Sequence, residues 1–529
     1  MSMAHAAPEV YTAQAVASMS AQRIAQLLQA KAQTIAELQR QVDWFRRQIF
    51  GHKSERYLAE PEPLQMHLGQ LLGETPALTP LVEPAEPAPA ASIVPAHRRR
   101  KPGRDFTDTP GSAPFFDESK VPVHTIELKS PEVQGLTPEQ YEVIGQKVSH
   151  RLAQRPGSYV VLQYVRPIIK RRDTQTLHCA AAPLGVIEGS RADVSFIVGL
   201  LVDKFRYHLP LYRQHQRLLD AGFTLSRPWL TQLVQLAAQL LQAIYEAQLA
   251  SICSGHVITM DEVPVKAGQA GNGQMKATYF WPVYGERDEV CFPHFESRRH
   301  EHVQQVLGTR LAKGTVLLSD GYAAYLAYAK KLGIVHAQCW AHTRRGIFEA
   351  RDVQPQAAGR ALEQIAALYK VEEQIRQRNL SGQAKRLHRL THSKPLVDKF
   401  FAWIDQQFEH LGLLPSNPLI KALAYARDRR AGLSVFLDDP AVSIDTNHIE
   451  RALRPIPTGR KNWLFCWTEV GARYTGIVQS LIATCRLQGI DPYTYLVDVL
   501  QRVGQHPASR IQELTPRRWK TLFAHQPLR

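Results

Sequence analysis

Two short stretches decide the fold of this chain: VITMDEVPVK at residues 257–266 and TVLLSDGYAAY at residues 315–325. Each contains a run of apolar residues that is typical of a buried strand. Asp261 interrupts the first run, and Asp320 directly follows the second. Such an aspartate is often only a turn or strand-end residue, but a buried carboxylate is costly unless it is paired or binds a metal. These two aspartates are therefore the first candidates for a functional site.

The surrounding residues predict an alternation of strands and helices. We expect strands at His256–Lys266, Met275–Tyr284, Glu289–Phe295, Thr315–Ser319 and Ile334–Gln338, with helices near Glu301–Leu311, at Tyr322–Lys331 and from about Ala341. Consecutive strands can pair antiparallel, whereas strands joined through a helix pair in parallel. The resulting order, β-β-β-α-β-α-β-α, is that of an α/β, ribonuclease-H-like fold. There the first and fourth strands are parallel neighbours, so the two aspartates would face each other.

A third acid is expected from a helix beside the sheet. Helical spacing in NHIERALR, residues 447–454, puts Glu450 on one face with other polar residues. The residues expected around this carboxylate are Asn447, Arg451, Arg454, Arg460 and Lys461. Such a setting suits a site that holds metal and phosphate together, although a surface helix with salt bridges is the structural alternative. Glu262 and Asp445 are rival acids.

Three carboxylates with open positions favour Mg²⁺, or Mn²⁺, because these ions prefer oxygen ligands and keep several waters. A pair of such ions can activate a water or a 3′-hydroxyl and stabilise the leaving oxygen. We therefore expect Asp261, Asp320 and Glu450 to bind two ions and to support in-line displacement at a DNA phosphodiester.

Several motifs together resemble one family. They are FGHKSER (50–56), TMDEVPVK (259–266), SDGYAAY (319–325), CWAHTRR (339–345), NHIERALRPIPTGRKNWLF (447–465) and DPYTYL (491–496). In this set and order, the chain resembles bacterial DDE transposases of the insertion sequence sixty-six type, which are TnpC-like. The resemblance implies that the catalytic acids are Asp261, Asp320 and Glu450. It also implies that residues 346–439 are a helical insertion before the last acid.

The chain departs from this family in its cysteines. The resemblance leads one to expect a zinc-finger-like segment with paired cysteines, but residues 105–190 contain only Cys179, so we expect no zinc there. Cys339 and His342 could suggest a metal site, but packing of Cys339 and Trp340 is the favoured interpretation, with Arg344 and Arg345 contacting phosphate. A later trio of aromatic residues could stack on a base, although core packing is favoured; it comprises Trp463, Phe465 and Trp467.

Composition limits the class of protein. The 529 residues carry 64 Lys and Arg against 48 Asp and Glu, a net charge of +16 that favours a polyanionic partner such as DNA. Six scattered cysteines without a CxxC pair argue against a disulfide scaffold and suit a reducing compartment. Apolar runs are too short for a membrane span and no secretory signal is evident. We expect a cytoplasmic, nucleoid-associated protein with no membrane partner.

Domain organisation follows from shifts in composition. In the N-terminal half we expect a zipper-like coiled-coil helix in 1–56, a Pro/Ala/Glu-rich linker in 57–118, a small β segment in 119–190 and a helix-turn-helix-like DNA-binding region in 191–250. A catalytic core follows in 251–345 and 440–488, and the helical insertion 346–439 interrupts it. The chain ends in a helical segment, 489–529. Three of these interpretations have alternatives. The zipper helix could pack on its own protein, the basic run 97–104 in the linker could be a solvated tether rather than a phosphate contact, and the helix-turn-helix could be a plain helical hairpin.

The function that these observations favour is a DDE transposase. It would bind terminal inverted repeats and target DNA, work as a homodimer or a higher synaptic assembly, and operate with or without helper proteins of the same element. A catalytically silent DNA-binding repressor and a ribonuclease-H-like nuclease acting on hybrids or junctions are the rivals.

Overall fold

The computed structural model describes residues 20, 22, 24, 25, 28, 29, 31 and 32, and then residues 115–528 except 118, 120, 130–136, 156–157, 184, 272–273, 411–413, 464–465 and 467. The chain divides into two units, 1–105 and 106–529. In the first unit, seven described positions between 22 and 32 are helical. Most of the predicted zipper, the FGHKSER motif, the basic run and most of the linker lie outside the described residues.

The second unit begins with a β-rich segment. Its four-stranded sheet contains β1 (Val123–Glu127), β2 (Tyr141–Arg155), β3 (Ser158–Arg171) and β4 (Leu177–Cys179). The long strands β2 and β3 form an antiparallel ribbon, while β1 pairs parallel to β3. Phe115 and Phe116 are buried against this part of the protein. The described residues of this unit therefore begin inside the range predicted as linker.

Three helices follow: α4 (Val194–Phe205), α5 (Leu211–Asp220) and α6 (Arg227–Cys253). The last two correspond to the predicted helix-turn-helix. However, α6 is 27 residues long and buries apolar residues along most of its length, from Leu230 to Ile252. It contacts α4, α16 (Glu469–Leu487) and β9 (Glu289–Cys291), so most of α6 belongs to the core rather than to an exposed recognition helix.

The centre of this unit is a five-stranded sheet in the order β12-β11-β5-β8-β9. Its other strands are β5 (Val257–Met260), β8 (Val283–Gly285), β11 (Val316–Ser319) and β12 (Val335–Gln338). Strand β11 is parallel to both β5 and β12, whereas β5–β8 and β8–β9 are antiparallel. The α/β class and these relative directions agree with the pairing expected from the sequence.

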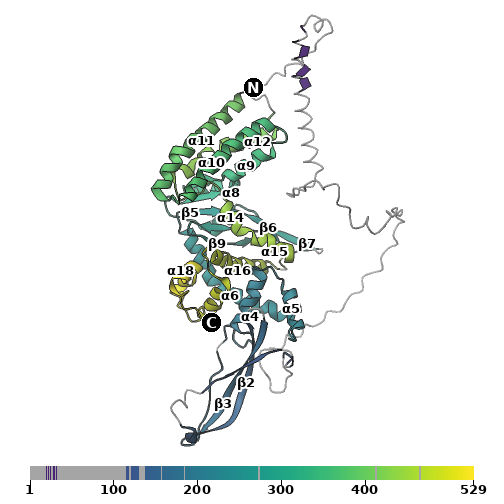
Figure 1. The fold of residues 1–529 in the computed structure, drawn as a ribbon, viewed down its shortest axis with the longest axis vertical. Coiled ribbons are helices and arrows are strands. Elements are labelled where there is room, and N and C mark those ends of the chain that lie inside the picture. The colour runs from purple at the N-terminus through teal and green to yellow at the C-terminus, as the bar shows by residue number, and fades with distance from the viewer. Residues whose placement is uncertain are drawn as a thin grey trace, which may run out of the picture. The chain divides into compact units, whose positions relative to one another are not determined.

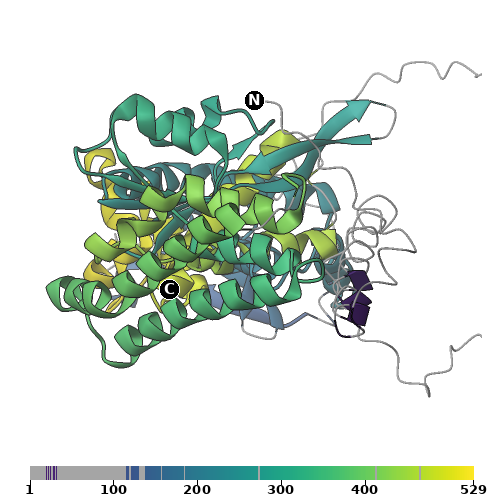
Figure 2. The ribbon, with the colours of Figure 1, turned by 90° about the horizontal axis from the view of Figure 1, so that it is seen from above.

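The predicted meander strands are wrong in their extent, because each is two strands. The additional strands are β6 (Val263–Gly271), β7 (Gln274–Phe280) and β10 (His294–Phe295), which form a separate sheet in the order β10-β7-β6. Pro282 and Pro293 lie at two of the breaks, and proline cannot donate a ladder hydrogen bond. Figure 2 shows the teal β6–β7 hairpin extending away from the neighbouring helices.

Each face of the central sheet is covered by helices, as Figure 1 shows. Val257, Val316 and Leu318 pack into one apolar core with α9–α13, while Ile258 and Leu317 pack into another with helices α6–α8. The covering helices are α7 (Glu301–Leu307), α8 (Ala323–Leu332), α9 (Trp340–Glu349), α10 (Pro355–Gln377), α11 (Gly382–His410), α12 (Pro418–Asp428) and α13 (Arg430–Asp438). Burial on both faces explains why β5 and β11 are mostly apolar and buried at every position.

The chain then returns to the sheet and ends in helices. These are α14 (Asn447–Leu453), α15 (Pro455–Trp463), α16, α17 (Pro492–Arg502), the 3₁₀ helix η3 (Ala508–Leu514) and α18 (Pro516–Leu522). Ile449 and Leu453 of α14 pack on the β6–β7 sheet. Among the described residues, no helix is both long and apolar enough to span a bilayer.

Candidate active site

The parallel pairing of β5 with β11 determines where the two aspartates lie. Val316 is opposite Val257 and Leu318 is opposite Thr259. Continuing this register by two residues would bring Asp320 beside Asp261, just beyond the ends of strands that are spaced about 4.8 Å apart, and Asp320 is near enough to raise the pKa of Asp261. Both carboxylates therefore emerge at one edge of the sheet, the edge where ligands bind in open parallel sheets.

Asp261 has no nearby cation to compensate its charge. Its Oδ1 accepts a hydrogen bond from the Glu262 backbone N–H at 2.8 Å, and no described Lys or Arg forms an ion pair with Asp261 or Asp320. Burial above all, together with the nearby carboxylates of Glu262, Asp320 and Glu450, raises the pKa of Asp261 to about 7, against the lowering effect of that backbone hydrogen bond. A carboxylate in this setting would be stabilised by a bound cation.

Glu450 is positioned by two anchors of α14. His448 Nε2 lies 3.1 Å from Thr259 Oγ1 of β5. At the N-cap, the backbone N–H and the hydroxyl of Thr446 donate to Cys339 Sγ at 3.3 and 3.2 Å. Glu450 is thereby brought near enough to Asp261 to act on its pKa.

The same anchor explains the CWAH motif. Burial raises the pKa of Cys339 to about 11, so the sulfur is a neutral thiol near pH 7 rather than a thiolate ligand. Trp340 is fully buried and its Nε1–H donates to the Leu433 carbonyl at 2.8 Å. These contacts are the packing role favoured from the sequence, and they connect the start of α9 to α14.

The two rival acids have structural partners of their own. Glu262 is ion-paired with Arg298 and accepts a hydrogen bond from Tyr325 Oη at 2.6 Å. Asp445 accepts from Asn447, at 3.1 Å from the backbone nitrogen and 2.6 Å from Nδ2. The sequence could not have predicted Arg298 or Tyr325 as partners of Glu262, because no local spacing pattern connects these residues.

The loop after Asp320 is tightly packed. The Tyr322 backbone N–H donates to Asp320 Oδ1 at 2.9 Å. A Cβ atom added to Gly321 would lie 2.4 Å from Tyr425 Oη and 2.8 Å from Arg429 Nε, so only glycine fits. Helix α12 and Arg429, which directly follows it, therefore contact the aspartate loop.

The expected DNA-contact residues divide into separate groups. Arg344, Arg345 and Asn447 line one cavity between α9, α10 and α14, and Arg345 Nη2 lies 3.7 Å from Glu450 Oε1. Among the residues the structure describes, this is the ion pair of Glu450. Four other cations were expected around Glu450, and none of them forms an ion pair with this carboxylate. They are Arg451 on α14, Arg454 at its C-cap, and Arg460 and Lys461 on α15.

Arg460 contacts the neighbouring sheet instead. Its Nη1 donates to the Pro264 carbonyl of β6 at 2.8 Å, which ties α15 to the hairpin. The side chains of Trp463, Phe465 and Trp467 lie outside the described part of the chain, so the prediction of base stacking by these residues stays a prediction.

The residues at the sheet edge fit a divalent cation in charge and donor type, but they do not form a closed cage. Within the described residues, no three His, Cys, Asp or Glu side chains are close enough together to hold a metal ion. Mg²⁺ commonly takes only one or two protein carboxylates and completes its shell with water and phosphate oxygens. Asp261 and Asp320 would therefore suffice as the protein ligands of such an ion, with Glu450 nearby.

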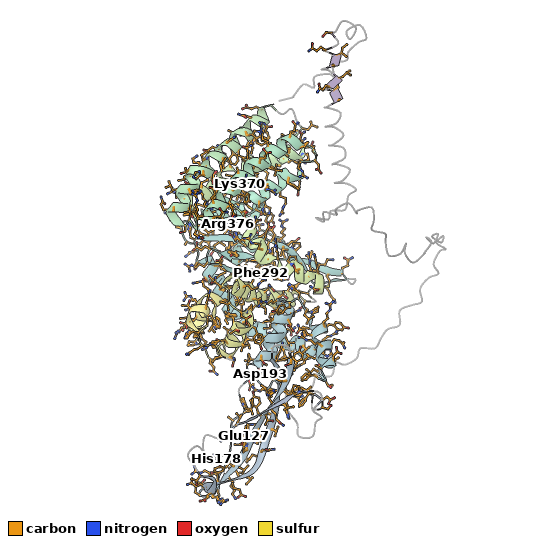
Figure 3. All side chains as sticks on the ribbon, in the orientation of Figure 1. Glu127, His178, Asp193, Phe292, Lys370 and Arg376 are labelled. Carbon is orange, nitrogen blue, oxygen red and sulfur yellow. The ribbon has the colours of Figure 1, made fainter. Side chains whose placement is uncertain are left out.

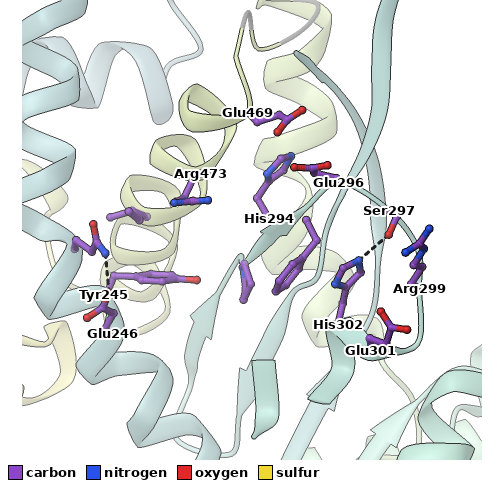
Figure 4. Close-up of a pocket in the computed structure, with 14 residues that line it drawn as sticks. Tyr245, Glu246, His294, Glu296, Ser297, Arg299, Glu301, His302, Glu469 and Arg473 are labelled. Carbon is purple, nitrogen blue, oxygen red and sulfur yellow. Dashed lines mark hydrogen bonds between the residues drawn. The ribbon is translucent and has the colours of Figure 1, made fainter. Parts of the chain in front are cut away.

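A second cavity, of 630 Å³, lies between α6, β10 and α16. Figure 4 shows its polar lining, in which Ser297 and His302 are hydrogen-bonded at 2.7 Å. Four glutamates line it against only two arginines. Burial lowers the pKa of His294 to about 4, so this imidazole is neutral near pH 7. The excess of carboxylates makes this cavity unsuited to a nucleic-acid phosphate.

Comparisons with known proteins give consistent matches. Residues 189–474 match the model described as "Transposase IS66 family", residues 480–517 match "IS66 C-terminal element", and residues 37–106 match "Transposase C of IS166 homeodomain". Among curated relatives, "Uncharacterized protein y4hP" of Sinorhizobium fredii is 28% identical over 93% of this chain and 90% of its own length. "Uncharacterized protein y4qI" of the same organism is 30% identical over 72% of each chain.

Proposed function

Because this chain belongs to the IS66 transposase family, we propose that it is a DDE transposase that cuts DNA at the ends of an insertion sequence and joins the ends to a target. The observation that supports this most is the shared sheet edge of Asp261 and Asp320, with Glu450 near enough to raise the pKa of Asp261. Buried, mutually repelling carboxylates of this kind are typical of functional sites rather than of structural ones.

In this proposal, Asp261 and Asp320 hold Mg²⁺ or Mn²⁺ and Glu450 completes the set. Two bound ions would supply Lewis-acid activation of the attacking hydroxyl and stabilisation of the leaving oxygen. The protein's own contribution is orientation. Parallel pairing of β5 and β11 positions the aspartates, and the Cys339 and His448 anchors position α14.

The finer architecture is part of the same proposal. The strand order β12-β11-β5-β8-β9, with its parallel and antiparallel pairs, supports a ribonuclease-H-like core. We further propose that residues 346–439 are a helical insertion in that core, that the N-terminal half binds terminal repeats, and that residues 21–50 pair two copies at the DNA ends. Such a protein would work on DNA in the cytoplasm.

A catalytically silent repressor is the second candidate. It is favoured by one observation, that no three acidic or other ligating side chains of the described residues are gathered closely enough to hold a metal. This candidate predicts DNA binding without any metal-dependent cleavage.

The test is strand cleavage and joining on the end DNA of the chain's own element, with Mg²⁺ or Mn²⁺. Asp320→Asn should bind this DNA normally and lose at least about a hundredfold in cleavage rate, because metal ions supply several kcal/mol of transition-state stabilisation. Glu349→Gln, an exposed carboxylate on α9, is the matched control and should cleave normally. Binding without cleavage in every variant, with helper proteins added, would favour the repressor.

A further inference from the structure

The groove between α9 and α10 is a second feature of the region around Glu450. Its volume is 610 Å³, and Figure 3 labels two of its residues, Lys370 and Arg376, on the helical part of the protein. The charged, aromatic and amide residues that line it are Arg344, Arg345, Phe348, Tyr369, Lys370, Glu373, Arg376 and Asn447. We call it the α9–α10 groove.

The charge of this groove is strongly positive. Four cationic side chains line it against one carboxylate, Glu373, and this carboxylate is ion-paired with Arg376. No described acid forms an ion pair with Arg344 or Lys370, and both side chains are exposed. This balance is opposite to that of the acidic cavity beside α16, so of these two cavities the groove is the one suited to phosphate groups.

The groove also presents an aromatic face. Phe348 is 43% exposed although it is large and apolar. The guanidinium carbons of Arg351 and Arg344 lie 4.6 and 5.9 Å from the centre of its ring. An exposed ring among cations is the combination on which single-stranded nucleic acids bind, because bases stack on the ring while the cations contact the backbone.

The groove is continuous with the candidate active site through Arg345. The Arg345 guanidinium lines the groove, and its Nη2 also lies 3.7 Å from Glu450 Oε1. Arginine binds phosphate at least as well as carboxylate, through the same planar set of donors. An anion in the groove would therefore compete with Glu450 for Arg345.

We propose that the α9–α10 groove binds a single DNA strand next to the catalytic acids, with phosphates on Arg344, Arg345 and Lys370 and one base on Phe348. A phosphate on Arg345 releases Glu450, which then joins Asp261 and Asp320 as a metal ligand. The DNA strand thus completes a metal site that the DNA-free protein holds open. This inference rests on the proposed function in taking DNA as the substrate.

The first test measures binding in EDTA, so that no cleavage occurs. Fluorescence anisotropy would follow the full-length protein on a labelled oligo(dT) of about 20 nucleotides and on a duplex of equal length, at several salt concentrations. Lys370→Ala and Arg344→Ala should each weaken oligo(dT) binding and reduce the salt slope by about 0.7, the value for one phosphate contact on a single strand. Lys399→Ala, an exposed lysine of α11 outside the groove, should change neither.

Substitution of the aromatic residue separates stacking from charge. Phe348→Leu should weaken oligo(dT) binding about fivefold or more, since one stacked base is worth about 1–3 kcal/mol. The salt slope and duplex binding should stay unchanged, and Phe348→Tyr should restore affinity. Equal oligo(dT) affinity in wild type, Phe348→Leu and Lys370→Ala would overturn the groove proposal while leaving the transposase proposal intact. Oligo(dT) binding that depends on the groove residues, in a protein that never cleaves end DNA, would overturn the transposase proposal and leave the groove proposal intact.

The second test measures Mn²⁺ affinity by electron paramagnetic resonance of the free ion. Oligo(dT) should strengthen Mn²⁺ binding to the wild type several-fold beyond the sum of protein and DNA measured separately. Arg345→Ala should bind Mn²⁺ without DNA as tightly as the wild type does with DNA. The double variant Arg345→Ala/Glu450→Gln should lose this gain in Mn²⁺ affinity. An Mn²⁺ affinity of the wild type that does not respond to DNA would overturn the exchange of partners at Arg345.

Discussion

The unusual carboxylate of Asp261 makes the metal-free protein sensitive to pH. The ordinary pKa of this side chain is 3.8, and in the folded protein the pKa is about 7. Because the folded-state pKa is raised, the folded protein binds more protons than the unfolded chain between about pH 4 and pH 7. The contribution of Asp261 to stability therefore falls as the pH rises through this window, and it stays low above pH 7.

The size of this loss follows from the shift. A difference of 7 − 3.8, or about three units of pKa, corresponds to about 4 kcal/mol. Asparagine does not titrate, so Asp261→Asn should be up to about 4 kcal/mol more stable than the wild type above pH 7, relative to the difference at pH 4. With an unfolding entropy of about 2.1 cal/mol/K per residue, roughly 400 residues convert this energy into about 5 °C of Tm.

The assay is thermal unfolding of both proteins in EDTA between pH 4 and pH 8, repeated with saturating Mg²⁺. The wild type should lose Tm relative to Asp261→Asn as the pH rises, and Mg²⁺ should return that loss to the wild type alone. Glu349→Gln, the exposed carboxylate, should follow the wild type throughout. Parallel pH profiles of wild type and Asp261→Asn, or an equal response of both to Mg²⁺, would refute this reasoning.

Three other substitutions test the packing that positions the site. Gly321→Ala forces a methyl group against the hydroxyl of Tyr425, so it should cost about 1–3 kcal/mol in urea unfolding and slow DNA cleavage. Arg389→Met leaves the buried partner Glu372 without a counterion, which should cost about 3–5 kcal/mol, whereas replacing both residues by apolar ones should restore most of that stability. Cys339→Ala removes the acceptor at the cap of α14 and should cost about 1–3 kcal/mol and slow cleavage, with Cys339→Ser less affected.

Each of these expectations has a clear opposite. Gly346→Ala, whose methyl would meet Ala422 at an ordinary 3.5 Å, is the control for Gly321→Ala and should be nearly neutral, so equal effects of the two would contradict the steric argument. Additive losses from Arg389 and Glu372 substitutions would contradict their coupling. Normal cleavage by Cys339→Ala would show that α14 is held by other contacts.

Much of the central sheet could be predicted from the sequence, because the signal there is strong and local. VITM and VLLS are mostly apolar, and every one of their residues is buried, as in strands covered on both faces. Helices between the later strands require parallel pairing. The register that puts Asp320 beside Asp261 follows from that pairing. The cap of α17 is equally local, because the Asp491 side chain accepts from the Thr494 backbone N–H within one turn.

The errors arose where the structure depends on contacts between distant segments. Apolar, alternating residues across positions 256–266 and 275–284 predicted two long strands, but Pro282 and the loop at Asp261 divide them between two sheets. The predicted cationic surroundings of Glu450 came from its own helix, its C-cap and the next helix, α15. Its ion-pair partner is Arg345, on α9, and no spacing rule connects residues 105 positions apart.

The central claim is that Asp261 and Asp320 act as one unit in cutting DNA. The most direct measurement is the rate of metal-dependent strand cleavage by Asp261→Asn, Asp320→Asn and the double variant, on end DNA that all three bind equally. Residues that act together are strongly non-additive, so each single variant should lose at least about a hundredfold and the double variant should be no slower than either. Cleavage near the wild-type rate in either single variant, or losses that multiply in the double variant, would contradict the account.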